Sequence, residues 1–357
     1  MTESRLKRLR AEIDALDDEI LALLNRRAKA ALEVGAIKGE MGMKYYVPER
    51  EAEILRRLSS VNPGPFPNEG LKAIFREIIS ASLALEKPLS VAFLGPRATF
   101  THQACLKHFG ESALYVPQIN LTEVFDAVER NVAEYGVAPI ENSSEGVVSN
   151  TLDMFVDHNL LICGEILVEV DQDLLSVTGD IEHVKKVYSH PHAIAQCRAW
   201  LERNLRQVPV FDVESTARAA ELAVDDPSSA AIAGEAAAKI YGLKTIRKRI
   251  QDNTNNFTRF IILGKQPAAR TGNDKTSILF SARDEVGALH LMLEPFAKHN
   301  VNLTKIESRP VKKKAWEYLF FIDMTGHIAD EPVAGALNDL KMRAQFMKIL
   351  GSYPRAI

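Results

Sequence analysis

Apolar side chains at the start of the chain recur at intervals of three and four residues. The series is Leu6, Leu9, Ile13, Leu16, Ile20 and Leu23. This heptad spacing predicts an apolar seam along one long helix. Continued past Leu23, the same spacing places Arg27 on the seam, ahead of further apolar positions. Because a buried, unpaired charge is costly, Arg27 requires an anionic partner there.

Two more helical patterns complete a first segment, which we place at residues 1–88. A break over 39–46 precedes Pro48, and proline is tolerated in the first turn of a helix. A loop over 62–67 precedes a third helical pattern over about 68–86. Three such helices cannot enclose a core alone, so we expect this segment to dimerise through the seam.

The first helix also carries two cations near one face. Eleven residues at about 100° each bring Lys38 close to the face of Arg27, and Ala31 leaves space between them. Two cations that flank a small residue could hold a compact dianion. For Lys38 alone, a solvated charged stripe is the simpler explanation.

From about 89 to 265 the chain alternates short apolar runs with helical patterns, which indicates an α/β domain. Polar clusters occur where a strand pattern ends or a helix pattern begins. They are GPRATFT at 95–101, PIENSSEG at 139–146, SHPHAIAQC at 189–197, EST at 214–216 and NFTRF at 256–260. Such clusters are typical of two α/β lobes that face one cleft.

The second cluster offers the most chemistry. A short apolar run breaks at Pro139 and is followed at once by Glu141, Asn142 and Ser143. A carboxylate can exchange a proton or accept hydrogen bonds, and an amide can orient a carboxylate or a carbonyl. For this tripeptide in isolation, a turn followed by a helix cap is the simpler interpretation.

The last segment, about 275–357, has the βαββαβ order of a ferredoxin-like domain. The patterns predict strands over 276–281, 303–307 and 318–324 and near 350, with helices over 287–299 and 333–347.

Composition narrows the function. A net charge of −3 argues against nucleic acid or a membrane surface as the partner of the whole chain. Because no apolar run approaches the length of a membrane span and the first residues are charged, we expect a cytoplasmic protein with no membrane association.

Three widely separated cysteines without a CxxC motif indicate neither a disulfide framework nor a zinc site. His190 and His192 have no evident third ligand, so an ordinary turn is favoured over a metal site.

The helical segment resembles the all-helical chorismate mutases. The resemblance rests on Arg10, Arg26-Arg27, the run EVGAIK at 33–38, Arg50-Glu51 and the stretch from Ser82 to Glu86. It implies an intertwined dimer that binds chorismate and rearranges it to prephenate. No nucleophile is needed, because holding the substrate in a chair and stabilising charge on its ether oxygen suffice.

Carried over by position, the resemblance implies a role for each polar residue. Arg27 and a partner-chain Arg10 hold carboxylates, while Lys38 contacts the ether oxygen and a carboxylate. Glu51 meets the ring hydroxyl, and Arg50 and Ser82 complete the pocket. Two positions depart from the usual pattern: Val47 replaces a frequent carboxylate, and Glu86 replaces a glutamine that donates to the ether oxygen. An ionised glutamate only accepts, so Glu86 can donate there only when it is protonated.

The five polar clusters, in order, resemble the prephenate dehydratases over some 170 residues. Ala98 and His192 depart from the common pattern at positions that are not catalytic in that family. The resemblance assigns substrate-site roles to Glu141, Asn142, Ser189, Gln196, Glu214 and Thr258. The implied reaction is loss of CO2 and the ring hydroxyl from prephenate, which gives phenylpyruvate. Thr258 is the best candidate to donate a proton to the departing hydroxyl, although a hydroxyl bonded to backbone at a strand start is the alternative.

The last segment resembles the ACT regulatory domains of dehydratases. Gly287-Ala288-Leu289 and Glu307-Ser308-Arg309-Pro310 match their two phenylalanine-binding motifs. Glycine at a helix start permits close approach of a ligand. A surface turn that ends an edge strand is the alternative for the second motif. The resemblance implies feedback inhibition by L-phenylalanine bound between ACT domains.

Together these resemblances cover almost the whole chain, as domains at 1–88, 89–266 and 275–357. They predict a bifunctional chorismate mutase/prephenate dehydratase that works without a cofactor or a metal, as a homodimer or higher assembly. The domain order agrees, because the product of the first site is the substrate of the second. The rival hypothesis is a non-catalytic, two-lobed amino-acid sensor.

Overall fold

The computed structural model describes residues 2–43, 45–144, 146–282, 285–310 and 318–356. The chain divides into two compact units. Unit 1 comprises Met1–Leu89 with His108–Leu114, and unit 2 comprises Ser90–Lys107 with Tyr115–Ile357. No helix within the described ranges is both long and apolar enough to cross a membrane.

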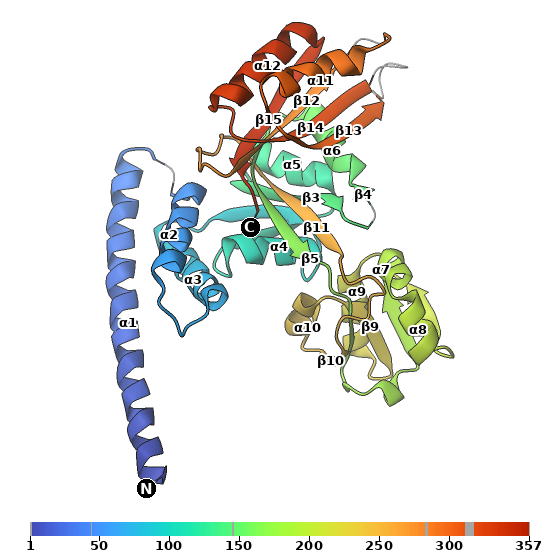
Figure 1. Ribbon diagram of the computed structural model, residues 1–357. Coiled ribbons are helices and arrows are strands. Elements are labelled where there is room, and N and C mark those ends of the chain that lie inside the picture. Colours follow the sequence, from blue (N-terminus) through green and yellow to red (C-terminus); the bar gives the residue numbers. More distant parts are fainter. Residues whose placement is uncertain (1, 44, 145, 283–284, 311–317, 357) are drawn as a thin grey trace. The chain divides into compact units, whose positions relative to one another are not determined.

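Three helices form most of unit 1. They are α1 (Thr2–Glu40), α2 (Pro48–Val61) and α3 (Asn68–Glu86). The 39 residues of α1 span about 58 Å at ~1.5 Å per residue, and Figure 1 shows this helix running far beyond the other two. Its seam is largely exposed, with Ile13 at 55% and Leu23 at 58% of their full accessibility. The predicted long helix is therefore confirmed, and the described residues of unit 1 leave its apolar stripe exposed.

Unit 1 also includes a short segment beyond the predicted boundary at residue 88. Glu77 accepts a hydrogen bond from the Glu111 amide at 3.0 Å, and Ser80 accepts one from the Ser112 amide at 3.3 Å. The Tyr46 hydroxyl lies 3.0 Å from His108 Nε2. These bonds attach the segment His108–Leu114 to the helical domain.

Three sheets organise unit 2 (Figure 1). The first has the order β2-β1-β3-β11-β5, with β4 beside β3. Its strands are β1 (Ser90–Leu94), β2 (Leu114–Gln118), β3 (Tyr135–Asn142), β4 (Gly146–Val147), β5 (Leu161–Glu169) and β11 (Phe257–Gly264). Its helices are α4 (Phe100–Phe109), α5 (Leu121–Glu129) and α6 (Ser149–Asp157).

The second sheet has the order β10-β6-β9-β7-β8 and belongs to a second lobe. Its strands are β6 (Asp173–Ser176), β7 (Lys186–Ser189), β8 (Val210–Asp212), β9 (Ser229–Ala233) and β10 (Lys244–Arg247). Its helices are η1 (Ile181–His183), α7 (Pro191–Gln196), α8 (Arg198–Asn204), α9 (Thr216–Asp225) and α10 (Glu235–Tyr241). The chain enters this lobe after β5 and returns through β11, so two neighbouring strands of the first sheet carry both crossings. The predicted two-lobed α/β domain is confirmed.

The third sheet, of order β13-β14-β12-β15, confirms the ferredoxin-like domain. Its elements are β12 (Asp274–Ser281), α11 (Ala288–Lys298), β13 (Leu303–Pro310), β14 (Tyr318–Thr325), α12 (Glu331–Arg343) and β15 (Phe346–Pro354). The predicted helix over 333–347 was too long at its end, because β15 already begins at Phe346 and pairs with β12.

One face of this third sheet packs against the first sheet. Leu279, Phe321 and Tyr353 share a buried core with residues of β5 and β11, such as Ile162 and Leu263. The opposite face is covered by α11 and α12. The ferredoxin-like domain and the first lobe are therefore joined by a common apolar core, which brings their polar side chains into contact as well.

Candidate active sites

The end of β3 contains an irregularity that directs its side chains. Asn142 pairs with Thr258 of β11 and Glu141 with Arg259, but the next pair is Pro139 with Phe260. Ile140 is thus an extra residue, and such a bulge redirects the side chains that follow it. Ala138 and Ile140 face the core shared with the third sheet. With strict alternation, Asn142 would face this core as well. Because of the bulge, Glu141 lies on the core side instead, and Asn142 and Thr258 lie on the opposite face of the sheet.

Asn142 and Thr258 form the polar end of a cavity. The Asn142 amide Nδ2 donates to Thr258 Oγ1 at 2.9 Å and to Asn256 Oδ1 at 2.8 Å. Asn142 Oδ1 in turn accepts the Ser144 amide at 2.9 Å. The Thr258 oxygen therefore serves as an acceptor to Asn142, and its own proton is directed elsewhere.

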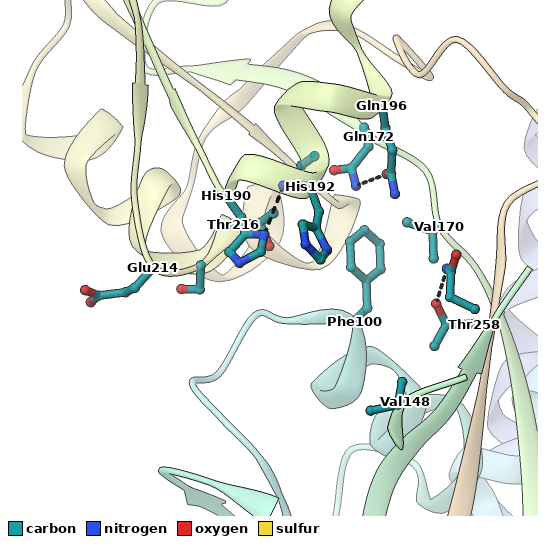
Figure 2. Close-up of a pocket in the computed structure, with 13 residues that line it drawn as sticks. Phe100, Val148, Val170, Gln172, His190, His192, Gln196, Glu214, Thr216 and Thr258 are labelled. Carbon is teal, nitrogen blue, oxygen red and sulfur yellow. Dashed lines mark hydrogen bonds between the residues drawn. The ribbon is translucent and has the colours of Figure 1, made fainter. Parts of the chain in front are cut away.

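Both lobes line this cavity, which has a volume of about 280 Å³. The residues are Phe100, Asn142, Val148, Val170, Gln172, His190, His192, Ala193, Gln196, Glu214, Ser215, Thr216 and Thr258. Figure 2 shows the labelled side chains converging from both lobes, with the Phe100 ring between His192 and Thr258 in this view. Gln172 Nε2 donates to Gln196 Oε1 at 3.1 Å. The cavity thus combines amides, hydroxyls and an aromatic ring.

Charge is sparse around the cavity. Within the described part of the chain, Glu214 is the single carboxylate that lines it, and no lysine or arginine does. In Figure 2 the Glu214 carboxylate points away from Thr258. The first residue of α9, Thr216, also lines the cavity, and Ser215 caps that helix by accepting the Arg218 amide at 3.0 Å. A helix start of this kind favours an anion without supplying a full positive charge.

Four of the six dehydratase residues predicted from the sequence line the cavity: Asn142, Gln196, Glu214 and Thr258. Ser189 does not line it; its side chain is fully buried, and its hydroxyl donates to the Ile232 carbonyl at 2.7 Å. Glu141 lies on the opposite face of β3, where it pairs with Lys305. Glu145 of the same motif lies outside the described residues.

Sequence reasoning did not single out Gln172, which follows the crossing strand β5. Its only signal is a polar triplet, Asp171 to Asp173, directly after an apolar run. Gln172 Oε1 is buried and, among the described residues, accepts no hydrogen bond, so it is available to a ligand hydroxyl. His190 accepts the His192 amide at 3.3 Å and caps α7, which is the ordinary turn that the sequence favoured.

A second cavity, of about 120 Å³, lies among the helices of unit 1. It is lined by Arg27, Ala31, Lys38, Tyr45, Tyr46, Val47, Arg50, Glu51, Ile54, Ile79, Ser82, Leu83 and Glu86. Six of the seven residues predicted for the mutase therefore meet in one place. The exception is Arg10, which stands 17 residues before Arg27 on α1, or about 25 Å away at ~1.5 Å per residue.

Two cations of this cavity, Arg27 and Lys38, are held in position by neutral partners. Arg27 Nη1 donates to Ser82 Oγ at 2.6 Å, and Lys38 Nζ donates to the Tyr45 carbonyl at 2.8 Å. Burial lowers the pKa of Arg27, and the nearby Glu86 carboxylate partly opposes this change. These cations thus have room for an anionic partner, as the position of Arg27 on the seam required.

Glu86 occupies a constrained position beside them. A Cβ atom on Gly35 would lie 2.7 Å from Glu86 Cγ, so the glycine on α1 makes room for this side chain. Glu86 Oε2 is buried and has no hydrogen-bond partner among the described residues. Burial raises the pKa of Glu86, and the attraction of Lys38 and Arg27 only partly lowers it. The balance that the sequence left open therefore favours a protonated Glu86 more than in water.

Burial also raises the pKa of Glu51, to about 7, with Arg76 lowering it and Glu77 adding to the rise. Arg50 is mostly exposed and pairs with Glu53 at 2.6 Å. The raised pKa thus lies near neutral pH, for a carboxyl group that shares its cavity with Arg27, Lys38 and Arg50.

The predicted phenylalanine-binding residues lie in the third sheet's domain. Gly287 adopts a left-handed conformation, with φ at +81°, directly before α11, where Ala288 is buried and Leu289 exposed. The four residues Glu307, Ser308, Arg309 and Pro310 end the edge strand β13. They belong to the strand itself rather than to a turn.

One group of potential metal ligands, Asp126, Glu129 and His158, lies outside both cavities. Its members have protein partners: His158 Nδ1 is 3.0 Å from Glu129, which also accepts the Asn159 amide at 2.7 Å, and Asp126 accepts from Arg130 at 3.1 Å. This group therefore has a structural explanation.

Comparison with known proteins covers all three domains. Family profiles match residues 9–87 as "Chorismate mutase type II", 91–268 as "Prephenate dehydratase" and 276–341 as "ACT domain". The chain resembles the crystal structure of a prephenate dehydratase from Arthrobacter aurescens in complex with L-Phe. That match has a TM-score of 0.70 and 35% identity, over 75% of this chain and 90% of the other.

Two curated relatives extend over the full length. The bifunctional chorismate mutase/prephenate dehydratase of Aquifex aeolicus is 53% identical, over 99% of this chain and 98% of that protein. The one from Escherichia coli K12 is 31% identical, over 99% and 97%. Both are enzymes, which favours the enzyme over the two-lobed sensor. The two cavities, the three domains and these relatives agree, and the chain belongs to the bifunctional chorismate mutase/prephenate dehydratase family.

Proposed function

We propose that the cavity between the two lobes converts prephenate to phenylpyruvate, with Thr258 as the proton donor to the departing hydroxyl. The observation that carries this proposal is the hydrogen bond from Asn142 Nδ2 to Thr258 Oγ1. Because that bond uses the threonine oxygen as an acceptor, the hydroxyl proton is directed to a ligand. A positioned donor of this kind contributes typically 10²–10⁴-fold to a rate.

The low charge of this cavity supports the same reaction. As CO2 forms, electrons flow from the carboxylate into the ring while the hydroxyl leaves as water. A salt bridge to that carboxylate would stabilise it in the ground state and oppose its loss, whereas amides and apolar groups do so much less. The start of α9 offers partial positive charge for the carboxylate that stays. Gln172 and Gln196 supply further amides, and Glu214 remains a candidate for contact with the substrate at the edge of the cavity.

The helical cavity is the proposed site for rearranging chorismate to prephenate. Arg27, Lys38 and Arg50 match a dicarboxylate, and Ser82 fixes the orientation of Arg27. Lys38 and a protonated Glu86 face the ether oxygen, on which negative charge develops. Glu51 accepts from the ring hydroxyl. Arg10 completes the site from a second copy of the chain, which covers the exposed seam of α1 and makes the protein a homodimer.

L-phenylalanine is proposed to bind between two ACT domains and to inhibit the dehydratase. The dehydratase of Arthrobacter aurescens was crystallised in complex with L-Phe. Gly287 to Leu289 on one side and Glu307 to Pro310 on the other are the residues expected to bind it. Inhibition requires that phenylalanine bind more tightly to a less active arrangement of the chain.

One incubation tests the central claim. Purified protein supplied with chorismate should form prephenate and then phenylpyruvate, without an added metal or cofactor. Prephenate alone should also yield phenylpyruvate. A protein that binds these compounds without turning them over would instead be the two-lobed sensor.

A further inference from the structure

Six charged side chains meet where the third sheet packs on the first. Three carboxylates, Glu141, Glu165 and Asp323, face three cations, Arg259, Lys275 and Lys305. Most are well buried: Glu165 is 4% exposed, Arg259 9% and Lys305 15%. The cluster is neutral as a whole, so removal of one member leaves a poorly solvated charge without compensation.

Arg259 is bound mainly to other members of this cluster. It donates to Glu165 at 2.7 Å, to Asp323 at 2.6 Å and to the Tyr353 hydroxyl at 2.9 Å. Burial lowers its pKa, but Tyr353 and the two carboxylates outweigh this effect and raise the pKa above its usual value. Its distance to Glu141 is longer, 3.6 Å from Nη1 to Oε2.

Lys305 is the cation nearest to Glu141, and their contact is an ion pair rather than a directed hydrogen bond. Its Nζ lies 2.8 Å from Glu141 Oε2. Lys305 comes from β13 of the ACT domain, whereas Glu141 is the first residue after the bulged Ile140 and directly precedes Asn142. The same peptide segment therefore carries an ion pair to the ACT domain on one face and the hydrogen bond to Thr258 on the other.

We propose that Lys305 is a positioning residue for the dehydratase. By fixing Glu141, it keeps the bulged end of β3 in the geometry that aims Asn142 at Thr258. This inference rests on the proposed dehydratase function and assigns Glu141 a positioning role, through Asn142, in place of contact with the substrate.

A second contact of β13 reaches the other end of the same segment. Arg309 Nη1 donates to Ser149 Oγ at 2.6 Å, and its Nη2 lies 3.6 Å from Asp153 Oδ1. Ser149 is the first residue of α6. One strand of the ACT domain thus contacts both Glu141, directly before Asn142, and Ser149, seven residues after it. A shift of β13 would therefore change the position of Asn142 in the cavity.

The test compares Lys305→Met with Lys298→Met in the full-length protein. Met keeps the apolar stem of lysine and removes its charge. Lys298 is also in the ACT domain, but it pairs with Asp339 on the exposed side of α12, at 2.8 Å. We expect dehydratase kcat on supplied prephenate to fall roughly tenfold in Lys305→Met. This is within the ~10²-fold loss of rate that follows when a distant mutation displaces a catalytic group. KM should change little, Lys305→Arg should restore most of the rate, and Lys298→Met should match the parent protein.

Glu141→Gln provides an independent variant in case Lys305→Met does not fold. It should show the same fall in kcat, and the double variant should lose no more than the worse single variant, because both changes break one contact. Parent-like kcat in folded Lys305→Met, or additive losses in the double variant, would overturn the proposal. Those outcomes leave the dehydratase assignment standing, because that assignment fails only if the parent protein does not convert supplied prephenate to phenylpyruvate.

Discussion

The two cavities that we propose as active sites differ sharply in the charge of their linings. In unit 1, Arg27, Lys38 and Arg50 supply full positive charges among apolar side chains. In unit 2, amides and hydroxyls line the cavity, and within the described residues the single charged group apart from the histidines is the carboxylate of Glu214. The substrates alone do not explain this difference, because chorismate and prephenate are both dicarboxylates.

The fate of the carboxylates does explain it. In the rearrangement both carboxylates survive, so strong ion pairs can hold the substrate in a chair throughout the reaction. In the dehydration one carboxylate leaves as CO2, and a tight ion pair would stabilise what must be lost. The comparison therefore indicates that full positive charges are placed only where the reaction does not remove the carboxylate that they bind.

The two cavities also differ in whether one chain supplies all of the residues proposed for each site. Both lobes of the unit 2 cavity come from one chain, whereas the helical cavity lies on a helix with an exposed apolar seam. Arg10 lies on that helix about 25 Å from Arg27, at ~1.5 Å per residue. The mutase should therefore depend on assembly, and the cavity of the dehydratase should not.

The largest expected effect comes from Arg27→Ala. Loss of this cation should reduce mutase kcat/KM by roughly 10³-fold, comparable to removal of one strong transition-state donor. Turnover of supplied prephenate should stay close to that of the parent protein. Arg26→Ala is the matched control, because Arg26 is exposed on the same helix. Equal loss of both activities in folded Arg27→Ala would contradict the separation of the two sites.

Thr258→Ala should lower dehydratase kcat by roughly 10²-fold or more, the usual contribution of a positioned proton donor. Thr258→Ser keeps the hydroxyl and should retain most of the rate, while mutase activity should be unchanged in both. Steady-state assays with chorismate and with prephenate measure the two activities separately. A normal rate in Thr258→Ala would remove this residue from the mechanism.

Asn142→Asp should have a smaller effect, a loss of roughly 10-fold to 10²-fold in dehydratase kcat. The shape of the side chain is kept, but an ionised carboxylate only accepts hydrogen bonds. Thr258 would then donate its proton to the introduced carboxylate rather than to the substrate. If Asn142→Asp is as active as the parent protein, the orientation of Thr258 by Asn142 is not needed for the reaction.

The sequence predicted the helical cavity better than the cavity between the lobes, for a physical reason. A helical period fixes which face each side chain occupies, so spacing alone indicated Arg27 and Lys38. The other four predicted residues of this cavity came from the resemblance to the chorismate mutases. At the end of β3, one extra residue, Ile140, reverses the alternation. No periodic pattern encodes that bulge, and so the opposite directions of Glu141 and Asn142 could not be derived.

Contacts between segments far apart in sequence were the other feature that could not be predicted. The hydroxyl of Ser189 is bound by the carbonyl of Ile232, 43 residues later, and does not reach the cavity. Gln172 reaches it because the chain crosses between lobes directly before it. The short strands β6, β8 and β10 were not predicted either, since three or four residues are too few to show a period.

The smallest expected effect is a change in the pH dependence of the mutase. Glu86 must be protonated to donate to the ether oxygen, and burial raises its pKa above the usual value. Activity should therefore be present below that pKa and fall as the pH rises through it, by about tenfold per pH unit beyond it. Glu86→Gln supplies a permanent donor and should keep mutase kcat/KM high at the upper end of the range, with the dehydratase profile unchanged.

Glu51 is a second group expected to affect the pH dependence of the mutase, and the variant Glu51→Gln distinguishes its effect from that of Glu86. The pKa of Glu51 is raised to about 7 by burial, and its ionised form accepts better from the ring hydroxyl. Glu51 should thus contribute a rise in activity with pH near 7, opposite in sign to the fall from Glu86. Glu51→Gln should remove that rise and leave the fall. Mutase rates from acid to mildly alkaline pH in the parent and both variants measure the rise from Glu51 and the fall from Glu86. If the parent protein shows no alkaline fall and Glu86→Gln behaves identically, Glu86 does not donate to the ether oxygen, and Lys38 alone stabilises its charge.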